Sequence, residues 1–70
     1  MEFDNDNHMV KIFESIVDSP KTAQQISEKC SIPRSTVYRK LRKLEENQII
    51  LRKGIIENGI RNRIYKPNKV

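Results

Sequence analysis

Apolar residues in the first part of the chain recur at the spacing of one helical face. The stripe comprises Met9, Ile12, Phe13, Ile16 and Val17. The positions i, i+3, i+4, i+7 and i+8 are typical of an amphipathic helix. The preceding segment 4–6 (DND) can cap such a helix and suits the positive end of its dipole. Pro20 disfavours helical geometry at the residue before it, so the pattern predicts a helix over about residues 6–18.

A second, shorter helix is predicted at about residues 22–29. Thr22 can cap the free amides of its first turn, and Gln25 can reach back to the amide of Thr22, which together form a capping box. Ala23, Ile26 and Cys30 then share one face. Cys30 is therefore expected to be a small core residue, with a redox switch as the alternative.

A third helix is predicted at about residues 34–47, directly after a short turn. Pro33 suits the first turn of a helix, and no Gly or Pro interrupts the segment that follows. At 100° per residue, Leu41 and Leu44 lie within about 40° of Val37, so these side chains form the buried face. Two helices joined by a three- or four-residue turn are typical of the helix-turn-helix motif.

The remaining sequence changes to a pattern typical of strands. Asn58-Gly59 is a two-residue hairpin signal, because both turn positions favour positive φ. Strands are predicted at about residues 49–57 and 60–66, with Pro67 ending the second and Gly54 offering a place for a bulge. Three isoleucines near the tip either pack under the hairpin or contact a second copy: Ile55, Ile56 and Ile60. The predicted fold class is mainly α with a β-hairpin, three helices followed by two strands.

Length and composition limit the function classes. Seventy residues form one domain, residues 1–70, with a small core and no room for an enclosed catalytic cleft. No nucleophile–base pair, phosphate-binding glycine loop or paired carboxylate site can be assembled, and His8 is expected at the surface. We therefore expect no enzymatic activity, cofactor or metal. The absence of a long apolar run and of a secretory signal, and the single cysteine, favour a cytoplasmic protein without a membrane partner.

Charge is divided unevenly along the chain. Residues 1–30 carry a net charge of −3 and residues 31–70 a net charge of +8, which give the total of +5. A polyanionic partner that contacts only the C-terminal half accounts for this asymmetry. A solvated basic surface is the alternative.

The segment TAQQISEKCSIPRSTVYRKLRKLEENQII, followed by a basic hairpin, resembles a winged helix-turn-helix of the broad MarR/ArsR-like kind. The resemblance covers about residues 21–66 and is most specific in STVYRKLRKLEENQII and in the hairpin with Arg61, Arg63 and Tyr65. It implies a DNA-binding regulator whose third helix is the recognition helix and whose hairpin is the wing.

The sequence departs from this family pattern at two places. Ser31 stands where such motifs usually have Gly, so either it adopts positive φ or the turn has another shape. The helices that dimerise larger MarR-like proteins and hold their effector pocket do not follow the wing. The resemblance therefore supports DNA binding, and no small-molecule effector is predicted.

The polar side of the third helix carries the predicted DNA contacts. The N-terminal half of a recognition helix enters the major groove. Arg39 is the predicted base-reading residue, because its fork can bond both O6 and N7 of guanine. Ser35 and Thr36 can donate to phosphate or base edges, and Tyr38 can contact a phosphate or a thymine methyl. The remaining predicted contacts, to phosphate, are Arg34, Arg42 and Lys43. A solvated helix face is the alternative.

The second strand of the wing adds two basic residues. Arg61 and Arg63 alternate and therefore share a face. They are predicted to contact the DNA backbone or a narrow minor groove, with protection of an edge strand as the alternative. Tyr65 is expected to pack between the wing and the helices.

The leading hypothesis is a prokaryotic, sequence-specific, double-stranded DNA-binding transcriptional regulator that acts as a homodimer. A monomer of this size reads few base pairs, so twofold pairing would supply specificity. The first helix, with Phe3 ahead of it and Val10 outside its main stripe, is the expected interface. Two alternatives stay open: a protein-interaction adaptor, against which the exposed Arg and Lys residues count, and an RNA-binding module.

Overall fold

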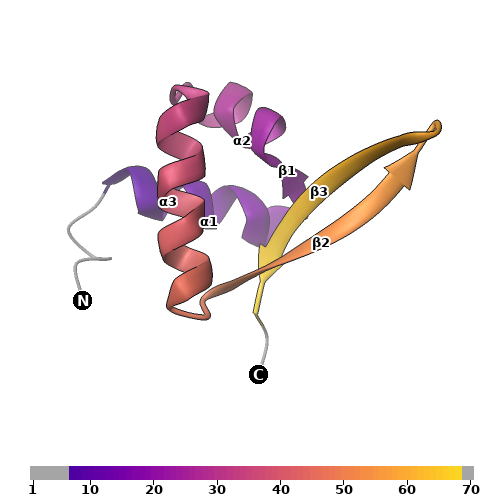
Figure 1. Cartoon of the computed structure of the whole chain (residues 1–70). Coiled ribbons are helices and arrows are strands. Elements are labelled where there is room, and N and C mark those ends of the chain that lie inside the picture. The colour runs from indigo at the N-terminus through magenta and orange to yellow at the C-terminus, as the bar shows by residue number, and fades with distance from the viewer. Residues whose placement is uncertain (1–6, 69–70) are drawn as a thin grey trace.

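The structure is a computed structural model that describes residues 7–68. Within these residues, three helices precede a long β-hairpin that projects away from them (Figure 1), which confirms the predicted fold class. The elements are α1 (Asn7–Asp18), β1 (Lys21–Thr22), α2 (Ala23–Cys30), α3 (Arg34–Glu46), β2 (Ile50–Glu57) and β3 (Ile60–Pro67). The predicted caps in segment 4–6, and Phe3, lie outside the described residues.

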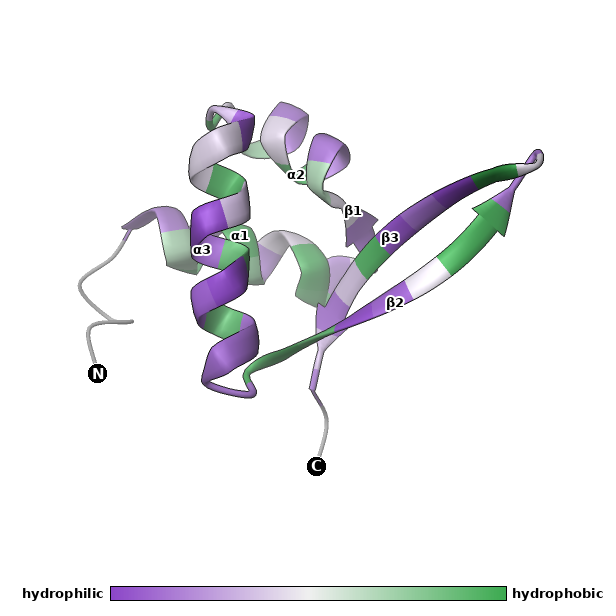
Figure 2. Cartoon of the chain, viewed as in Figure 1, coloured by the Kyte–Doolittle hydropathy of each residue, from purple (hydrophilic) through white to green (hydrophobic). Residues whose placement is uncertain are grey.

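The helices pack around one core that the base of the hairpin closes. The core consists of Met9, Ile12, Ile16, Ala23, Ile26, Ile32, Val37, Leu41, Leu44, Ile50 and Tyr65. Apolar and polar positions alternate around α3 (Figure 2), and its buried side chains Val37, Leu41 and Leu44 are those that the spacing predicts. Ile50 and Tyr65 come from β2 and β3, so the sheet and the helices share this core.

Val17 does not belong to the buried stripe of α1, and the prediction was wrong at this position. Its side chain is 56% exposed, and Phe13 is only half-buried. The buried face is centred on Ile12 and Ile16, and Val17 lies about 140° around the helix axis from Ile12. Ser15 occupies the buried face instead, where its hydroxyl donates to the carbonyl of Ile12 at 2.7 Å and so remains hydrogen-bonded.

α2 begins at the predicted capping box. Thr22 Oγ1 accepts a hydrogen bond from the backbone amide of Gln25 at 3.2 Å, and Gln25 Oε1 accepts one from the amide of Thr22 at 2.9 Å. Thr22 also belongs to β1, which pairs antiparallel with β3 through Lys21↔Tyr65 and Thr22↔Ile64. The sequence did not predict β1, because two residues carry no alternation and their partner strand is distant along the chain.

Ser31 gives the helix-turn-helix its turn by adopting a left-handed conformation, with φ 56° and ψ 43°. The backbone amide of Ile32 donates to the carbonyl of Ser27 at 3.2 Å, and the Ser27 hydroxyl donates to the carbonyl of Ile32 at 2.6 Å. Of the two shapes considered for this turn, the positive φ is the one found. A residue with a β-carbon pays a steric cost in this conformation, which Gly avoids.

We expect Ser31→Gly to stabilise the protein by about 1 kcal/mol, because Gly removes the steric cost of the left-handed conformation. For a domain of this size the melting temperature should rise by about 4–8 °C, measured by thermal unfolding. Ser31→Ala is the matched control: it keeps the β-carbon and should give no increase. Equal melting temperatures for the Gly and Ala variants would contradict the assignment of strain to this residue.

The three strands form one antiparallel sheet in the order β1-β3-β2. The register between β2 and β3 runs without a break from Ile50↔Pro67 to Glu57↔Ile60, so no bulge forms at Gly54. Asn58 and Gly59 have φ of 54° and 77°, as the predicted two-residue turn requires. The hairpin therefore has a fixed register, and each side chain has a defined face.

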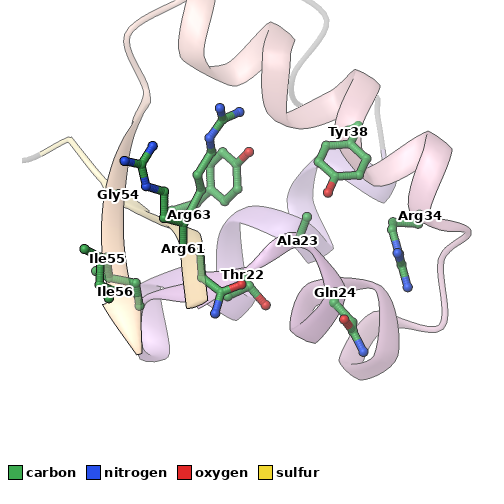
Figure 3. A pocket seen from close by; sticks show the side chains of 12 residues that line it. Thr22, Ala23, Gln24, Arg34, Tyr38, Gly54, Ile55, Ile56, Arg61 and Arg63 are labelled. Atoms are coloured by element: carbon green, nitrogen blue, oxygen red, sulfur yellow. The ribbon is translucent and has the colours of Figure 1, made fainter. Parts of the chain in front are cut away.

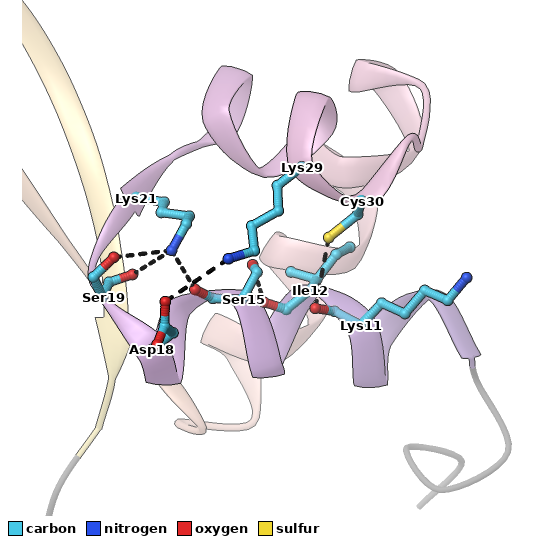
Figure 4. A network of polar contacts seen from close by, with 8 residues as sticks. All are labelled: Lys11, Ile12, Ser15, Asp18, Ser19, Lys21, Lys29 and Cys30. Carbon is cyan, nitrogen blue, oxygen red and sulfur yellow. Dashed lines mark hydrogen bonds and ion pairs between the residues drawn. The ribbon is translucent and has the colours of Figure 1, made fainter.

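Polar contacts join β1 and α2 to α1 (Figure 4). Lys21 Nζ donates to the carbonyl of Ser15 at 2.6 Å and to that of Ser19 at 3.2 Å, which places a cation at the negative end of the α1 dipole. Cys30 is only partly buried at the edge of the core, and its thiol donates to the carbonyl of Lys11 at 3.6 Å. The expectation that Cys30 is a core residue thus holds only in part.

Candidate nucleic-acid interface

The outward side of α3 is polar and accessible. Most of the side chains predicted to contact DNA are exposed, and Thr36 is half-buried. The set on α3 is Arg34, Ser35, Thr36, Tyr38, Arg39, Arg42 and Lys43. Arg39 lies opposite Val37 on the helix, so the packing that buries Val37 directs Arg39 toward solvent. Because α3 begins at Arg34, most of these residues belong to its N-terminal half.

A hollow of about 770 Å³ lies between the start of α2, the N-terminal half of α3 and the hairpin (Figure 3). The polar residues that line it include Thr22, Gln24, Arg34, Tyr38, Arg61 and Arg63. Three guanidinium groups from two separate elements therefore border one surface. No acidic side chain is among the described residues that line the hollow, so its charge is positive.

The wing directs its arginines to one face. Arg61 pairs with Ile56, Arg63 with Gly54, and Arg52 with Tyr65. Directly opposite residues of an antiparallel pair share a face, and so do residues two apart on one strand. Arg61 and Arg63 therefore share a face, as the alternation of side chains along the strand predicts. Arg52 lies on the same face.

The base of the wing is attached to the last turn of α3. Arg52 Nε lies 3.5 Å from Glu45 Oε2, and Tyr65 is buried beside this pair, as its predicted packing role requires. Burial raises the pKa of the Tyr65 hydroxyl, the Glu45 carboxylate adds to the rise, and Arg52 opposes it. Tyr65 therefore stays neutral and does not offset the positive charge of the wing.

The predicted residues do not all meet at the hollow. Among those that the structure describes, Arg34, Tyr38, Arg61 and Arg63 line it. The others project from α3 beyond it: Ser35, Thr36, Arg39, Arg42 and Lys43. This arrangement gives α3 a free outer surface and leaves a concave one between α3 and the wing.

Residues that the sequence analysis did not assign to this surface include Gln24, which lines the hollow, and Arg52, which shares the wing face of Arg61 and Arg63. Gln24 borders the hollow only because of the angle at which α2 docks, which the sequence does not indicate. The position of Arg52 could have been predicted, because Arg52, Gly54 and Ile56 are spaced two residues apart along one strand and therefore share a face.

A scan against protein-family models matches residues 10–69 to the model described as "Sugar-specific transcriptional regulator TrmB". The chain belongs to the TrmB family. The match covers α3 and the whole hairpin and most of α1, and it confirms the winged helix-turn-helix regulator family predicted from the sequence. The TrmB-family domain is therefore a DNA-binding transcriptional regulator domain.

Solved structures share the fold of this TrmB-family domain. Stf76 from the Sulfolobus islandicus plasmid-virus pSSVx matches with a TM-score of 0.84 and 18% identity, over 96% of this chain and 88% of that one. The reduced form of YodB from B. subtilis gives 0.83 and 24%, over 94% of this chain and 65% of YodB. The regulator SlyA gives 0.69 and 24%, over 96% of this chain and 50% of SlyA. The TrmB-family domain thus spans about half to two-thirds of YodB and SlyA.

No curated protein sequence matches the TrmB-family domain. Between residues 7 and 68, no helix is both long and apolar enough to cross a membrane.

Proposed function

We propose that this domain binds a specific sequence of double-stranded DNA, with the N-terminal half of α3 in the major groove and the wing on the backbone or in the minor groove. Arg39 reads guanine, and Ser35, Thr36 and Tyr38 contact phosphates or base edges. The remaining contacts are to the backbone or the minor groove, from Arg34, Arg42, Lys43, Arg61 and Arg63.

The observation that carries this proposal is the positive surface shared by α3 and the wing. Arg34 from the helix and Arg61 and Arg63 from the hairpin border one hollow, and no described acidic residue lines it. A polyanion that follows this surface meets cations from both elements. The exposed position of Arg39 on the outer side of α3 leaves its guanidinium free to reach base edges.

Selection of bound sequences from random duplex DNA tests the proposal. We expect enrichment of one motif, and a palindromic motif if two copies bind together. Recovery of no motif, together with binding to single-stranded or structured RNA, would favour an RNA-binding module. Failure to bind either nucleic acid would favour a protein-interaction adaptor.

We further propose that the domain acts as a homodimer through α1. Val10, Phe13 and Val17 recur along one side of α1 and, with Glu14 and Asp18, line a shallow hollow of about 540 Å³. Val17 is exposed and Phe13 is only half-buried at the edge of the core, so this side leaves apolar surface in contact with water. Contact with a second copy would remove these side chains from water.

Val17→Glu should shift a dimer toward monomers, because it places a charge in the apolar contact. Sedimentation of free and DNA-bound protein measures the change. His8→Glu is the control, since His8 is exposed on the same helix but does not line the hollow. A wild-type protein that is monomeric both free and on DNA would refute the dimer.

We propose a MarR-like, prokaryotic regulator that resides in the cytoplasm and catalyses no reaction. No small-molecule effector is included in the proposal.

A further inference from the structure

The tip of the wing exposes two isoleucines that the core does not use. Ile56 is 74% exposed and Ile60 is 63% exposed, and they flank the turn at Asn58 and Gly59. Neither is a core residue, so neither side chain is explained by the stability of the fold. Of the two alternatives that the sequence leaves open, packing under the hairpin is therefore excluded for Ile56 and Ile60.

The strand register places the two isoleucines on opposite faces of the hairpin. Ile56 is opposite Arg61, whereas Ile60 is opposite Glu57. Because directly opposite residues share a face, Ile56 accompanies Arg61 and Ile60 accompanies an acidic residue. Ile56 also lines the positive hollow between wing and α3 (Figure 3), and Ile60 is not among the described residues that line it.

Gly54 leaves room beside Ile56 on the same face. A β-carbon built on Gly54 would have no atom within 4 Å, and Gly54 is paired with Arg63. Near the tip this face therefore presents Arg61 and Arg63, one exposed aliphatic side chain and one stretch of bare backbone, with Arg52 nearer the base of the hairpin. A missing side chain in a strand permits close approach of another backbone.

We infer that Ile56 enters the minor groove of the bound duplex, flanked by Arg61 and Arg63, and partly unstacks one base step. This inference rests on the proposed DNA binding. Isoleucine is one of the apolar side chains that proteins insert between base steps from the minor groove, which bends the duplex toward the major groove. The arginines suit the negative potential of a narrow minor groove, and Gly54 lets the sugar-phosphate backbone approach the strand.

The charge around Ile56 favours DNA over a protein partner as the occupant. Its cross-strand neighbour is basic, the next pair on that face contributes Arg63, and the acidic Glu57 belongs to the other face. Unstacking is easiest at pyrimidine–purine steps such as TA and CA. Ile56 therefore adds a sequence preference at the unstacked base step through the flexibility of that step, without a hydrogen bond to a base.

Parallel selections with the wild type, Ile56→Ala and Ile60→Ala test this inference. The wild type should enrich a TA or CA step to one side of the major-groove motif. Ile56→Ala should lose that enrichment and bind the wild-type motif roughly tenfold more weakly. Ile60→Ala should behave as the wild type. Both side chains are exposed, so thermal unfolding of the three proteins should be alike and serves as the check of folding.

Two measurements on the wild-type motif report the unstacking itself. Energy transfer between dyes on the duplex ends should show a bend that Ile56→Ala reduces and Ile60→Ala keeps. Permanganate, which oxidises unstacked thymines, should react at the enriched step only with wild type and Ile60→Ala. A bend and step preference that Ile56→Ala leaves intact would overturn the inference while DNA binding stands. Absence of any enriched motif with the wild type would overturn both.

Discussion

The affinity for duplex DNA should fall by about a thousandfold for each bound subunit when monovalent salt rises from about 50 to about 200 mM. Each phosphate neutralised by Lys or Arg releases about 0.9 counterion, so about five or six contacts per subunit give a log–log slope near −5. The residues that we expect to supply these contacts are Arg34, Arg42, Lys43, Arg61 and Arg63. Titration of a labelled duplex at several salt concentrations measures the slope.

Two double variants decide which arginines and lysines produce this slope. Arg61→Ala with Arg63→Ala removes two cations that contact the DNA backbone or minor groove and should make the slope shallower by about two per subunit. Lys11→Ala with Lys29→Ala removes the same charge from α1 and α2, outside the proposed surface, and should leave the slope unchanged. An affinity for DNA that does not change with salt concentration would contradict the electrostatic basis of binding. It would favour a protein-interaction adaptor instead. Equal losses for both variants would show that net charge matters and the wing does not.

The helices and the hairpin could be predicted because each carries its own local signal. Thr22 and Gln25 mark the start of α2 through a capping box, and Asn58-Gly59 marks the hairpin turn through its positive φ. β1 has no such signal, since its two residues form a strand only because β3 lies beside them. Val17 was misplaced because an apolar stripe is wider than the surface its helix buries, and tertiary packing decides which edge is covered.

In the candidate site, too, the features with a local sequence signal could be predicted, and those set by tertiary packing could not. The outward direction of Arg39 and the shared face of Arg61 and Arg63 follow from the periods of a helix and of a strand. The hollow that brings Arg34 together with the wing depends on docking angles between elements, which no local pattern encodes. The sequence could therefore name most of the basic residues of the surface but not its concave shape.

The base-reading role falls on Arg39, and Arg39→Ala should cost about 1–3 kcal/mol of binding free energy on the preferred duplex. Loss of a bidentate contact to guanine removes discrimination at that base pair, so preference should relax at one position of the motif. Arg39 is exposed and opposite the buried Val37, so the melting temperature should stay nearly constant. Affinity for a preferred and a scrambled duplex measures both effects.

Arg42→Ala is the matched control for Arg39→Ala. Arg42 is also exposed on α3, but it is assigned to phosphate, so its loss should weaken binding to the preferred and the scrambled duplex by the same factor. The wing double variant should behave as Arg42→Ala does, with the shallower salt slope described above. If the wing variant instead lost preference at a guanine while Arg39→Ala lost only general affinity, the roles of helix and wing would be reversed. The comparison works because the three variants leave the apolar face of α3 untouched, so any difference arises at the DNA.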